Sequence, residues 1–354
     1  MTEDRWEHGS SFHLPPLEPA GSASSTGLPF GVTLGSGRVA LRLLLQHGHE
    51  QHGWARVWIP SYYCSDVVES LEGIPLEVRR YPCGPLGSEG PLPGSLEGDV
   101  LLRVNYFGWG IPEADRSYVG PVIEDHTHAP WGATASNADY GFASLRKTLP
   151  LPDGAVVWSP RSLPLPPPAK PHPLHVQAVE LRLAAMALKA AFLSGAGGDK
   201  QVFRELEQRA EEWIARGHPS SCSAYSKVVL SKLPIEAWAD LRTENHDQLR
   251  TELTGAPLVG VLGPERTASP LAAILRLPSE LARDAFRAAL TRERIYTAVL
   301  WPIPAGAKPH RPEDAEFSTT TLAVHVDARY TPEDMTRVAH TICRLAHAIE
   351  RECE

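Results

Sequence analysis

The sequence lacks the features that mark secreted, membrane and nucleic-acid-binding proteins. Its five cysteines are dispersed and form no C-x-x-C pair, which is typical of reduced thiols in a cytosolic protein rather than of a disulfide framework. The N-terminus has no apolar segment of the signal-peptide type, and no apolar run approaches membrane-spanning length. No block of lysine and arginine occurs, and the net charge of -8 argues against nucleic-acid binding. We therefore expect a cytoplasmic protein that binds neither a membrane nor a nucleic acid.

Length and composition allow two domains and a sizeable hydrophobic core. The chain has 354 residues, of which 42% are hydrophobic and 21% are charged. Short runs that suit β-strands, such as 121–124 and 140–144, alternate with helical patterns from residue 31 onward. This alternation predicts an α/β fold with a mainly parallel sheet that is covered by helices on both faces.

Three regions of the chain differ in composition and pattern. Residues 1–30 are rich in proline, serine and glycine and predict an extended N-terminal arm. Residues 31–253 carry the alternating pattern and predict a large domain, whereas residues 254–354 predict a small α+β domain. The small domain is expected to contain three strands, near 273–277, 296–300 and 322–326. It is also expected to contain two helices, with Ser279 and Thr331 as their N-caps.

The segment Gly35-Ser36-Gly37 precedes a helical pattern and is a candidate binding element. Backbone N–H groups at a helix start, together with the positive end of the helix dipole, favour a phosphate. Glycine lets the backbone approach such a ligand closely. Taken alone, a glycine-rich helix start is more often structural.

A second candidate is the strand-like run 122–124, which is followed by Asp125 and His128. Ligands of parallel sheets lie beyond the carboxyl ends of the strands. An aspartate there can form a charge-assisted hydrogen bond to a ring nitrogen and keep that nitrogen protonated. The alternative is that Asp125 caps the segment that follows it.

A third candidate is the run 140–144, because Lys147 follows Ser144 by three residues. A lysine removed from water has a lowered pKa and is the usual nucleophile in Schiff-base formation. Ser144 can bind a phosphate, and Arg146 can add positive charge. The alternative is that Arg146 and Lys147 are two solvated surface cations.

Two tyrosines, Tyr62 and Tyr63, follow another predicted strand at 56–59. A tyrosine at the end of a strand can lie flat on a planar cofactor. The alternative is that these are ordinary buried core tyrosines.

In their order and spacing, these segments resemble the DegT/DnrJ-type aminotransferases, the sugar and antibiotic-pathway branch of the fold-type I pyridoxal-phosphate enzymes. The matching segments lie in the first half of the chain, at 35–41, 59–63, 104–108, 123–125 and 144–154. The second half matches only in the order of its elements. The resemblance implies a fold-type I architecture, with a large domain built on a mainly parallel sheet and a small C-terminal α+β domain.

The resemblance also implies roles for the residues around the reactive end of pyridoxal phosphate. Lys147 would carry the cofactor as a Schiff base and move protons during catalysis. Asp125 would pair with the pyridine nitrogen, and His128 would lie near the phenolic oxygen. Tyr63, or Tyr62 if the register is shifted by one, would stack on the ring.

On the phosphate side, the resemblance implies that Ser36, Gly37 and Ser144 bind the cofactor. Arg38 is a further cofactor-binding candidate, at a position where the family more often has a threonine. A partner-subunit asparagine that usually helps to hold the phosphate has no clear match around residues 221–226.

Transamination is the reaction that the resemblance implies. An amino donor would leave its amino group on the cofactor, and a keto sugar or keto intermediate of a biosynthetic pathway would accept it. Elimination, decarboxylation or carbon–carbon bond formation on the same scaffold is an alternative, as is a non-catalytic regulatory protein. Active sites of this fold form at a dimer interface, so the resemblance also implies a homodimer.

Two further features of the sequence are candidate sites. The histidines at 47, 49 and 52 match no zinc-ligand spacing, so we expect no metal there and interpret them as a solvated helix face. Arg329 follows the strand-like run 322–326, where enzymes of this fold often bind a substrate carboxylate. The alternative for Arg329 is an ion pair with Asp327.

Overall fold

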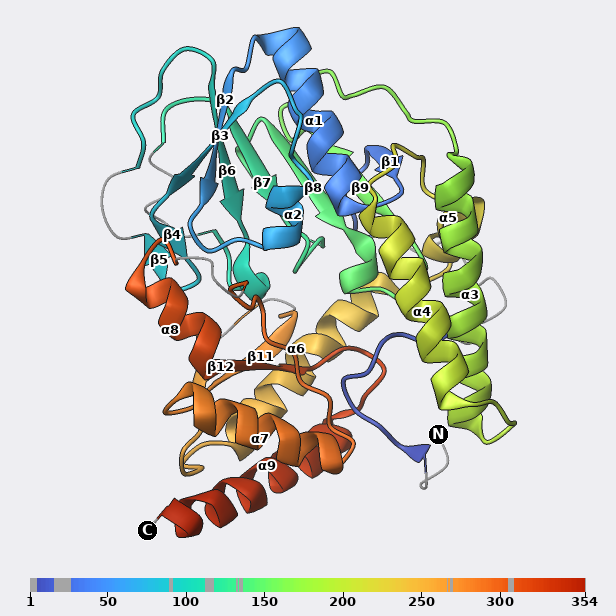
Figure 1. Cartoon of the computed structure of the whole chain (residues 1–354), viewed down its shortest axis with the longest axis vertical. Coiled ribbons are helices and arrows are strands. Elements are labelled where there is room, and N and C mark those ends of the chain that lie inside the picture. The colour runs from blue at the N-terminus through green and yellow to red at the C-terminus, as the bar shows by residue number, and fades with distance from the viewer. Residues whose placement is uncertain are drawn as a thin grey trace.

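Two β-sheets of different size organise the chain (Figure 1). The computed structural model describes residues 5–353 apart from 16–26, 89–91, 112–117, 132, 134–135, 266, 268–269 and 305–308. The larger sheet has seven strands in the order β1-β9-β8-β7-β6-β2-β3. These strands are β1 (Val32–Leu34), β2 (Arg56–Pro60), β3 (Glu77–Tyr81), β6 (Asp99–Val104), β7 (Val122–Asp125), β8 (Tyr140–Ser144) and β9 (Ala155–Trp158).

The larger sheet is mainly parallel, as predicted. Neighbouring strands from β3 through β2, β6 and β7 to β8 all pair in parallel, whereas β9 and β1 extend one edge in antiparallel pairing. Asp125 on β7 is level with Val104 on β6 and with Phe142 on β8. The carboxyl ends of β6, β7 and β8 therefore lie side by side, at the edge where α/β sheets bind ligands.

Helices cover both faces of the larger sheet. Phe142 of β8 belongs to the core that also contains the apolar stripe of α1 (Gly37–His52). Ala143, the next residue along the strand, points to the opposite face and packs with Val229 of α5 (Ala224–Leu230). The other helices of this part of the chain are α2 (Ser65–Glu69), α3 (Pro173–Ser194) and α4 (Lys200–Ala215), and a small hairpin is formed by β4 (Cys83–Gly84) and β5 (Gly87–Ser88).

The smaller sheet is antiparallel and has the order β10-β11-β12. Its core is shared with helices α6, α7 and α9, which lie around it in the lower part of Figure 1. Two predicted caps are present: Ser279 Oγ accepts from the Ala282 N–H at 3.2 Å, and Thr331 Oγ accepts from the Asp334 N–H at 3.3 Å. The elements are α6 (Ile235–Glu252), β10 (Gly260–Leu262), β11 (Ala272–Arg276), α7 (Glu280–Arg292), α8 (Pro312–Thr320), β12 (Thr321–His325) and α9 (Pro332–Cys353).

The prediction of a strand near residues 296–300 is wrong, because this segment forms only isolated bridges. The Tyr296 N–H donates to His8 O at 2.8 Å, whereas the Ala298 N–H donates to Ala323 O at 3.0 Å. Tyr296 and Ala298 thus bond to different segments, and no continuous ladder of hydrogen bonds forms.

Residues 5–15 of the N-terminal arm run between the α3–α4 pair and the smaller sheet (Figure 1). Trp6 belongs to the core of the smaller sheet. Lys189 of α3 donates to Ser10 Oγ at 2.8 Å, so the arm connects the two parts of the chain. Helix α6 packs against α9, and the predicted domain boundary at residue 253 stays a prediction.

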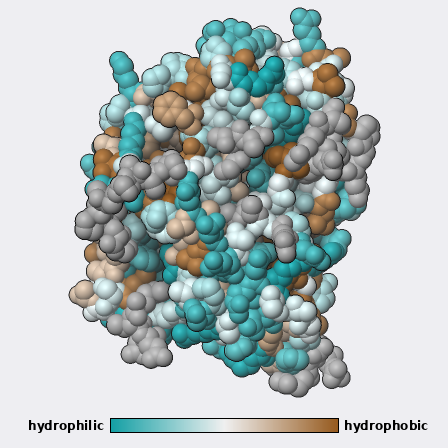
Figure 2. Space-filling view, turned by 180° about the vertical axis from the view of Figure 1, so that it is seen from behind, coloured by the Kyte–Doolittle hydropathy of each residue, from teal (hydrophilic) through white to brown (hydrophobic). Residues whose placement is uncertain are grey.

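None of the helices among the described residues is both long enough and apolar enough to cross a bilayer. On the face seen from behind, hydrophobic and hydrophilic side chains are interspersed (Figure 2).

Candidate active site

The carboxyl ends of the parallel strands open into a cavity of about 330 Å³. Residues that end or follow β2, β6, β7 and β8 line one side, and residues of the C-terminal part of the chain line the other. The structure brings together the eight predicted site residues in this lining: Ser36, Gly37, Arg38, Tyr63, Asp125, His128, Ser144 and Lys147.

The start of α1 forms one end of the cavity. Ser36 Oγ accepts a hydrogen bond from the Val39 N–H at 3.3 Å and caps the helix. A Cβ atom on Gly37 would come within 2.9 Å of Ser144 Cβ, closer than carbon atoms pack. Glycine therefore allows the first turn of α1, with its uncapped backbone N–H groups, to approach Ser144. This corner of the cavity is suited to an anion.

Lys147 ends the short 3-10 turn η5 (Leu145–Lys147) that follows β8, and its side chain lines the cavity. Within the described residues, its amine takes part in no hydrogen bond or ion pair. Burial, and then the neighbouring Arg146 guanidinium, lower the pKa of Lys147. A lowered pKa leaves more of the amine unprotonated, which is the form that attacks a carbonyl carbon.

Glu211 of α4 is a cavity residue that the sequence did not indicate. Its carboxylate accepts two hydrogen bonds from Arg146 Nη2, at 2.7 and 2.9 Å, and lies 3.9 Å from Arg38 Nη1. Burial opposes ionisation, but the Arg146 guanidinium, together with Lys147 and Arg182, outweighs it and lowers the pKa of Glu211 to about 2. Glu211 therefore stays ionised at neutral pH and partly neutralises the two arginines. The sequence contains no motif that relates Glu211 to the predicted strand ends, because even Lys147 lies ~64 residues before it.

Asp125 is held at the cavity by two hydrogen bonds. Its Oδ1 accepts from the Thr127 N–H at 2.8 Å, and its Oδ2 accepts from the Tyr63 hydroxyl at 2.6 Å. Burial raises the pKa of Asp125, and the hydrogen bonds from Thr127 and Tyr63 only partly offset this effect. The bond to Thr127 also places Asp125 at the start of a local turn, whereas residues 126–131 form no helix for it to cap. Stacking of Tyr63 on a cofactor stays a prediction. In the structure, the Tyr63 hydroxyl donates a hydrogen bond to Asp125.

His128 is buried and presents one defined tautomer. Its Nδ1 accepts from the Phe107 N–H at 3.0 Å, so the ring proton of the neutral imidazole is on Nε2. The ring stacks on Phe107, with centroids 5.4 Å apart, and on Trp301, with centroids 5.5 Å apart. Burial, and then the nearby Lys147, lower the pKa of His128 to about 3. His128 is thus a neutral hydrogen-bond donor at the cavity.

The opposite side of the cavity comes from the C-terminal part of the chain, and sequence reasoning did not identify it. We call it the C-terminal wall, formed by Leu271, Ala272, Ala298, Leu300, Trp301 and His325. The Leu271 N–H donates to Phe107 O at 2.9 Å, which joins this wall to the large-sheet side. The Tyr62 hydroxyl accepts from the Trp301 N–H at 2.8 Å and thereby fixes the Trp301 segment.

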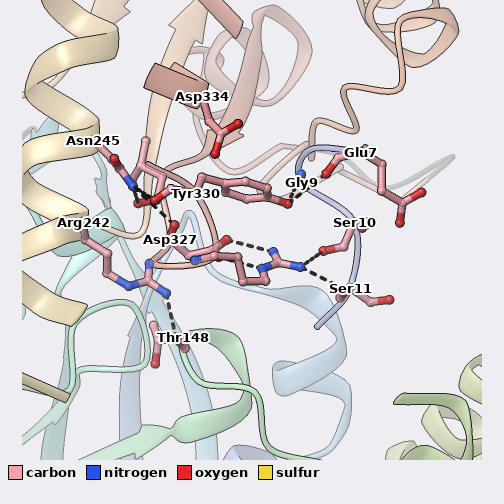
Figure 3. A network of polar contacts seen from close by, with 12 residues as sticks. Glu7, Gly9, Ser10, Ser11, Thr148, Arg242, Asn245, Asp327, Tyr330 and Asp334 are labelled. Atoms are coloured by element: carbon pink, nitrogen blue, oxygen red, sulfur yellow. Dashed lines mark hydrogen bonds and ion pairs between the residues drawn. The ribbon is translucent and has the colours of Figure 1, made fainter. Parts of the chain in front are cut away.

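Arg329 does not line the cavity and pairs with Asp327, as the alternative interpretation expected. Its Nε and Nη2 atoms lie 2.7 and 2.8 Å from the two carboxylate oxygens of Asp327. A remaining nitrogen donates to Ser10 O at 2.7 Å and to Ser11 O at 3.0 Å, two residues of the N-terminal arm that Figure 3 labels. Arg329 therefore holds the arm against the smaller sheet.

The histidines in the last turns of α1 bond to other parts of the protein. His47 and His52 lie 2.9 and 2.8 Å from Pro164 O and the Tyr140 hydroxyl, respectively. The expectation of a solvated face is wrong for His47, which is buried because the segment that contains Pro164 covers it.

Comparison with known proteins supports the architecture. No protein-family model matches the chain, and no curated protein sequence matches it. The sugar aminotransferase CalS13 from Micromonospora echinospora is 15% identical with a TM-score of 0.58, over 90% of this chain and 88% of that one. Spr1654 from Streptococcus pneumoniae, in its PLP form, is 13% identical with a TM-score of 0.61, over 92% and 88%.

A DegT DnrJ EryC1 StrS aminotransferase from Brucella abortus is 12% identical with a TM-score of 0.53, over 91% of this chain and 87% of that one. At such low identity the similarity concerns the arrangement of elements along nearly the whole chain. It agrees with the mainly parallel seven-stranded sheet described above. The chain therefore has the fold-type I architecture of pyridoxal-phosphate-dependent aminotransferases.

Proposed function

We propose that this protein is a pyridoxal-phosphate-dependent aminotransferase that binds its cofactor as a Schiff base on Lys147. The observation that carries the proposal is the amine of Lys147, which has no partner among the described residues and lines a cavity together with Asp125 and His128. A lysine with a lowered pKa, a carboxylate and a neutral imidazole donor are the groups that such a cofactor needs.

The lining residues fit the cofactor on chemical grounds. Asp125, anchored by Tyr63 and Thr127, would accept a hydrogen bond from the ring nitrogen. The Nε2–H of His128 would donate to the phenolic oxygen. Bound pyridoxal phosphate would supply an electron sink for the bonds around the substrate carbon that carries the amino group.

The phosphate would bind at the corner formed by the first turn of α1 and Ser144. The backbone N–H groups next to Gly37 can donate to phosphate oxygens there. Arg38 and Arg146 add positive charge close to this corner, and Glu211 limits that charge. A phosphate with two negative charges would then face a nearly matched set of cations and helix amides.

Lys147 would serve as a proton carrier as well as a nucleophile. Released from the cofactor, its amine would take a proton from the substrate carbon and return it to a neighbouring atom. Its lowered pKa suits this task, because burial leaves more of the amine in the unprotonated form that accepts a proton.

We propose a keto sugar as the amino acceptor and an amino acid as the donor. CalS13, which shares the fold, is a sugar aminotransferase, and the sequence resembles the sugar and antibiotic-pathway branch of aminotransferases. We also propose a cytoplasmic homodimer, which sedimentation equilibrium of the purified protein would test. Free, dispersed cysteines agree with a reducing compartment.

Spectroscopy of the half-reaction tests transamination. The protein loaded with pyridoxal phosphate is mixed with L-glutamate, and the visible absorption and the released 2-oxoglutarate are followed together. We expect one equivalent of 2-oxoglutarate per site and loss of the visible band. Release of ammonia or carbon dioxide in place of the keto acid would contradict transamination and favour another reaction on the same cofactor.

A further inference from the structure

The two sides of the cavity differ in charge. All six charged side chains of the described lining precede residue 216, and we call them the charged wall: Arg38, Asp66, Asp125, Arg146, Lys147 and Glu211. The described residues of the C-terminal wall include no charged side chain. Four of them are aliphatic, so Trp301 and His325 provide its side-chain polar atoms.

His325 is placed at the cavity by the smaller sheet. It is the last residue of β12 and pairs in register with Ala272 on β11, which also lines the cavity. Within the described residues, its ring nitrogens form no hydrogen bond and no ion pair. Burial lowers the pKa of His325 to about 4, so the ring is neutral at pH 7 and can both donate and accept.

The N-terminal arm packs against the His325 ring. Gly9 of the arm has a φ of +77°, and a Cβ atom there would lie 3.0 Å from His325 Cδ2. The glycine thus lets the arm backbone lie directly against the ring. Arg329 and Asp327, just beyond β12, pair with each other at 2.7 Å and do not line the cavity. His325 is therefore the polar ring that this region offers to a ligand.

We infer that His325 is a specificity-determining residue that hydrogen-bonds an uncharged polar group of the substrate, such as a sugar hydroxyl. The inference rests on the proposed function, because the substrate must occupy the same cavity as the cofactor. The charged wall takes the cofactor's phosphate and ring nitrogen, so the substrate lies toward the C-terminal wall. A neutral imidazole among aliphatic side chains matches a hydroxyl, whereas a carboxylate would find no cation on the described part of this wall.

The test uses the full chain loaded with pyridoxal phosphate and two substitutions, His325→Leu and His325→Asn. Each protein is titrated with D-glucosamine and with 4-amino-4-deoxy-D-glucose, and the visible absorption is followed. Methylamine, which has no hydroxyl group for His325 to bind, serves as the control probe. Cofactor affinity, measured by fluorescence quenching, shows whether each variant retains its fold.

We expect His325→Leu to weaken the binding of at least one amino sugar by about tenfold, because one hydrogen bond to the sugar is lost. His325→Asn, which keeps a neutral donor and acceptor, should lose less. The methylamine response and the cofactor affinity should stay within about twofold of the wild type, since neither involves the hydrogen bond at issue.

Equal amino-sugar affinities in the wild type and His325→Leu would overturn the inference, as would a wild type that shows no saturable response to either amino sugar. A wild type that fails to bind pyridoxal phosphate, or that does not respond to methylamine, would instead refute the proposed function. The two failures are therefore distinguishable.

Discussion

The charged wall and the C-terminal wall of the cavity differ in where their ionisable groups lie. On the charged wall, ionisable groups face the cavity, and Lys147 has no partner among the described residues. Around the C-terminal wall, Arg329 and Asp327 neutralise each other outside the cavity lining, where they hold the N-terminal arm. On this difference we propose that the large sheet provides the reactive groups, whereas the smaller sheet shapes the space for the substrate.

Lys147→Ala should give the largest effect, because it removes the reactive amine from the charged wall. We expect turnover to fall by a factor on the order of a thousand or more. Steady-state transamination with L-glutamate measures the effect, and Lys227→Ala, an exposed lysine outside the cavity lining, is the matched control. Turnover in Lys147→Ala equal to that of the control would contradict the assignment.

Arg329→Met should affect stability and leave the cavity intact. The substitution leaves the buried Asp327 carboxylate without its ion-pair partner, which costs about 3–5 kcal/mol of unfolding free energy. Urea unfolding measures the loss, and the double variant Arg329→Met with Asp327→Leu should recover part of it. An unchanged stability combined with a raised Michaelis constant would instead assign Arg329 to the substrate.

Glu211→Gln should strengthen phosphate binding at the charged wall. The carboxylate, with its pKa of about 2, is ionised at all pH values above about 4 and offsets Arg38 and Arg146. Removing the negative charge of Glu211 beside these two arginines should tighten the binding of inorganic phosphate roughly fivefold. Calorimetry measures this, with Glu212→Gln as the control, because Glu212 is exposed and bonds to Gln208 on the same helix. Weaker binding in Glu211→Gln would contradict the charge argument.

Tyr63→Phe should give the smallest effect, through Asp125. The Tyr63 hydroxyl lowers the pKa of Asp125 by hydrogen bonding, so its removal raises that pKa. Protonation of Asp125 then begins at higher pH, and the acidic limb of the pH–activity profile should move upward by roughly half to one pH unit. Tyr63→Leu, which also removes the ring, should lose more activity only if the ring stacks on the cofactor. An unmoved acidic limb in Tyr63→Phe would show that the hydroxyl does not control Asp125.

Local sequence patterns predicted the elements that carry Arg38, Asp125 and Lys147 of the charged wall. Ser36 caps a helix where the glycine-rich segment indicated one, and the run 140–144 is a strand that leads directly to Lys147. These features depend on neighbours within a few residues, and parallel pairing then places the strand ends at one edge of the sheet. Short-range signals were sufficient for this part.

The C-terminal wall and Glu211 could not be predicted in this way. His325 reaches the cavity because β12 pairs with β11 and the arm packs behind it, and Glu211 because α4 lies beside η5. These are contacts between distant segments, which no spacing pattern records. The strand expected at 296–300 failed for a related reason, since its bridging partners, His8 and Ala323, come from opposite ends of the chain.

The Schiff base on Lys147 is the central claim, and the visible absorption spectrum of the protein incubated with pyridoxal phosphate tests it most directly. The spectrum is recorded before and after borohydride reduction, and the reduced protein is then digested and mapped. We predict a visible band that disappears on reduction and a single modified peptide that contains Lys147. A colourless protein, or a label on a different lysine, would contradict the account.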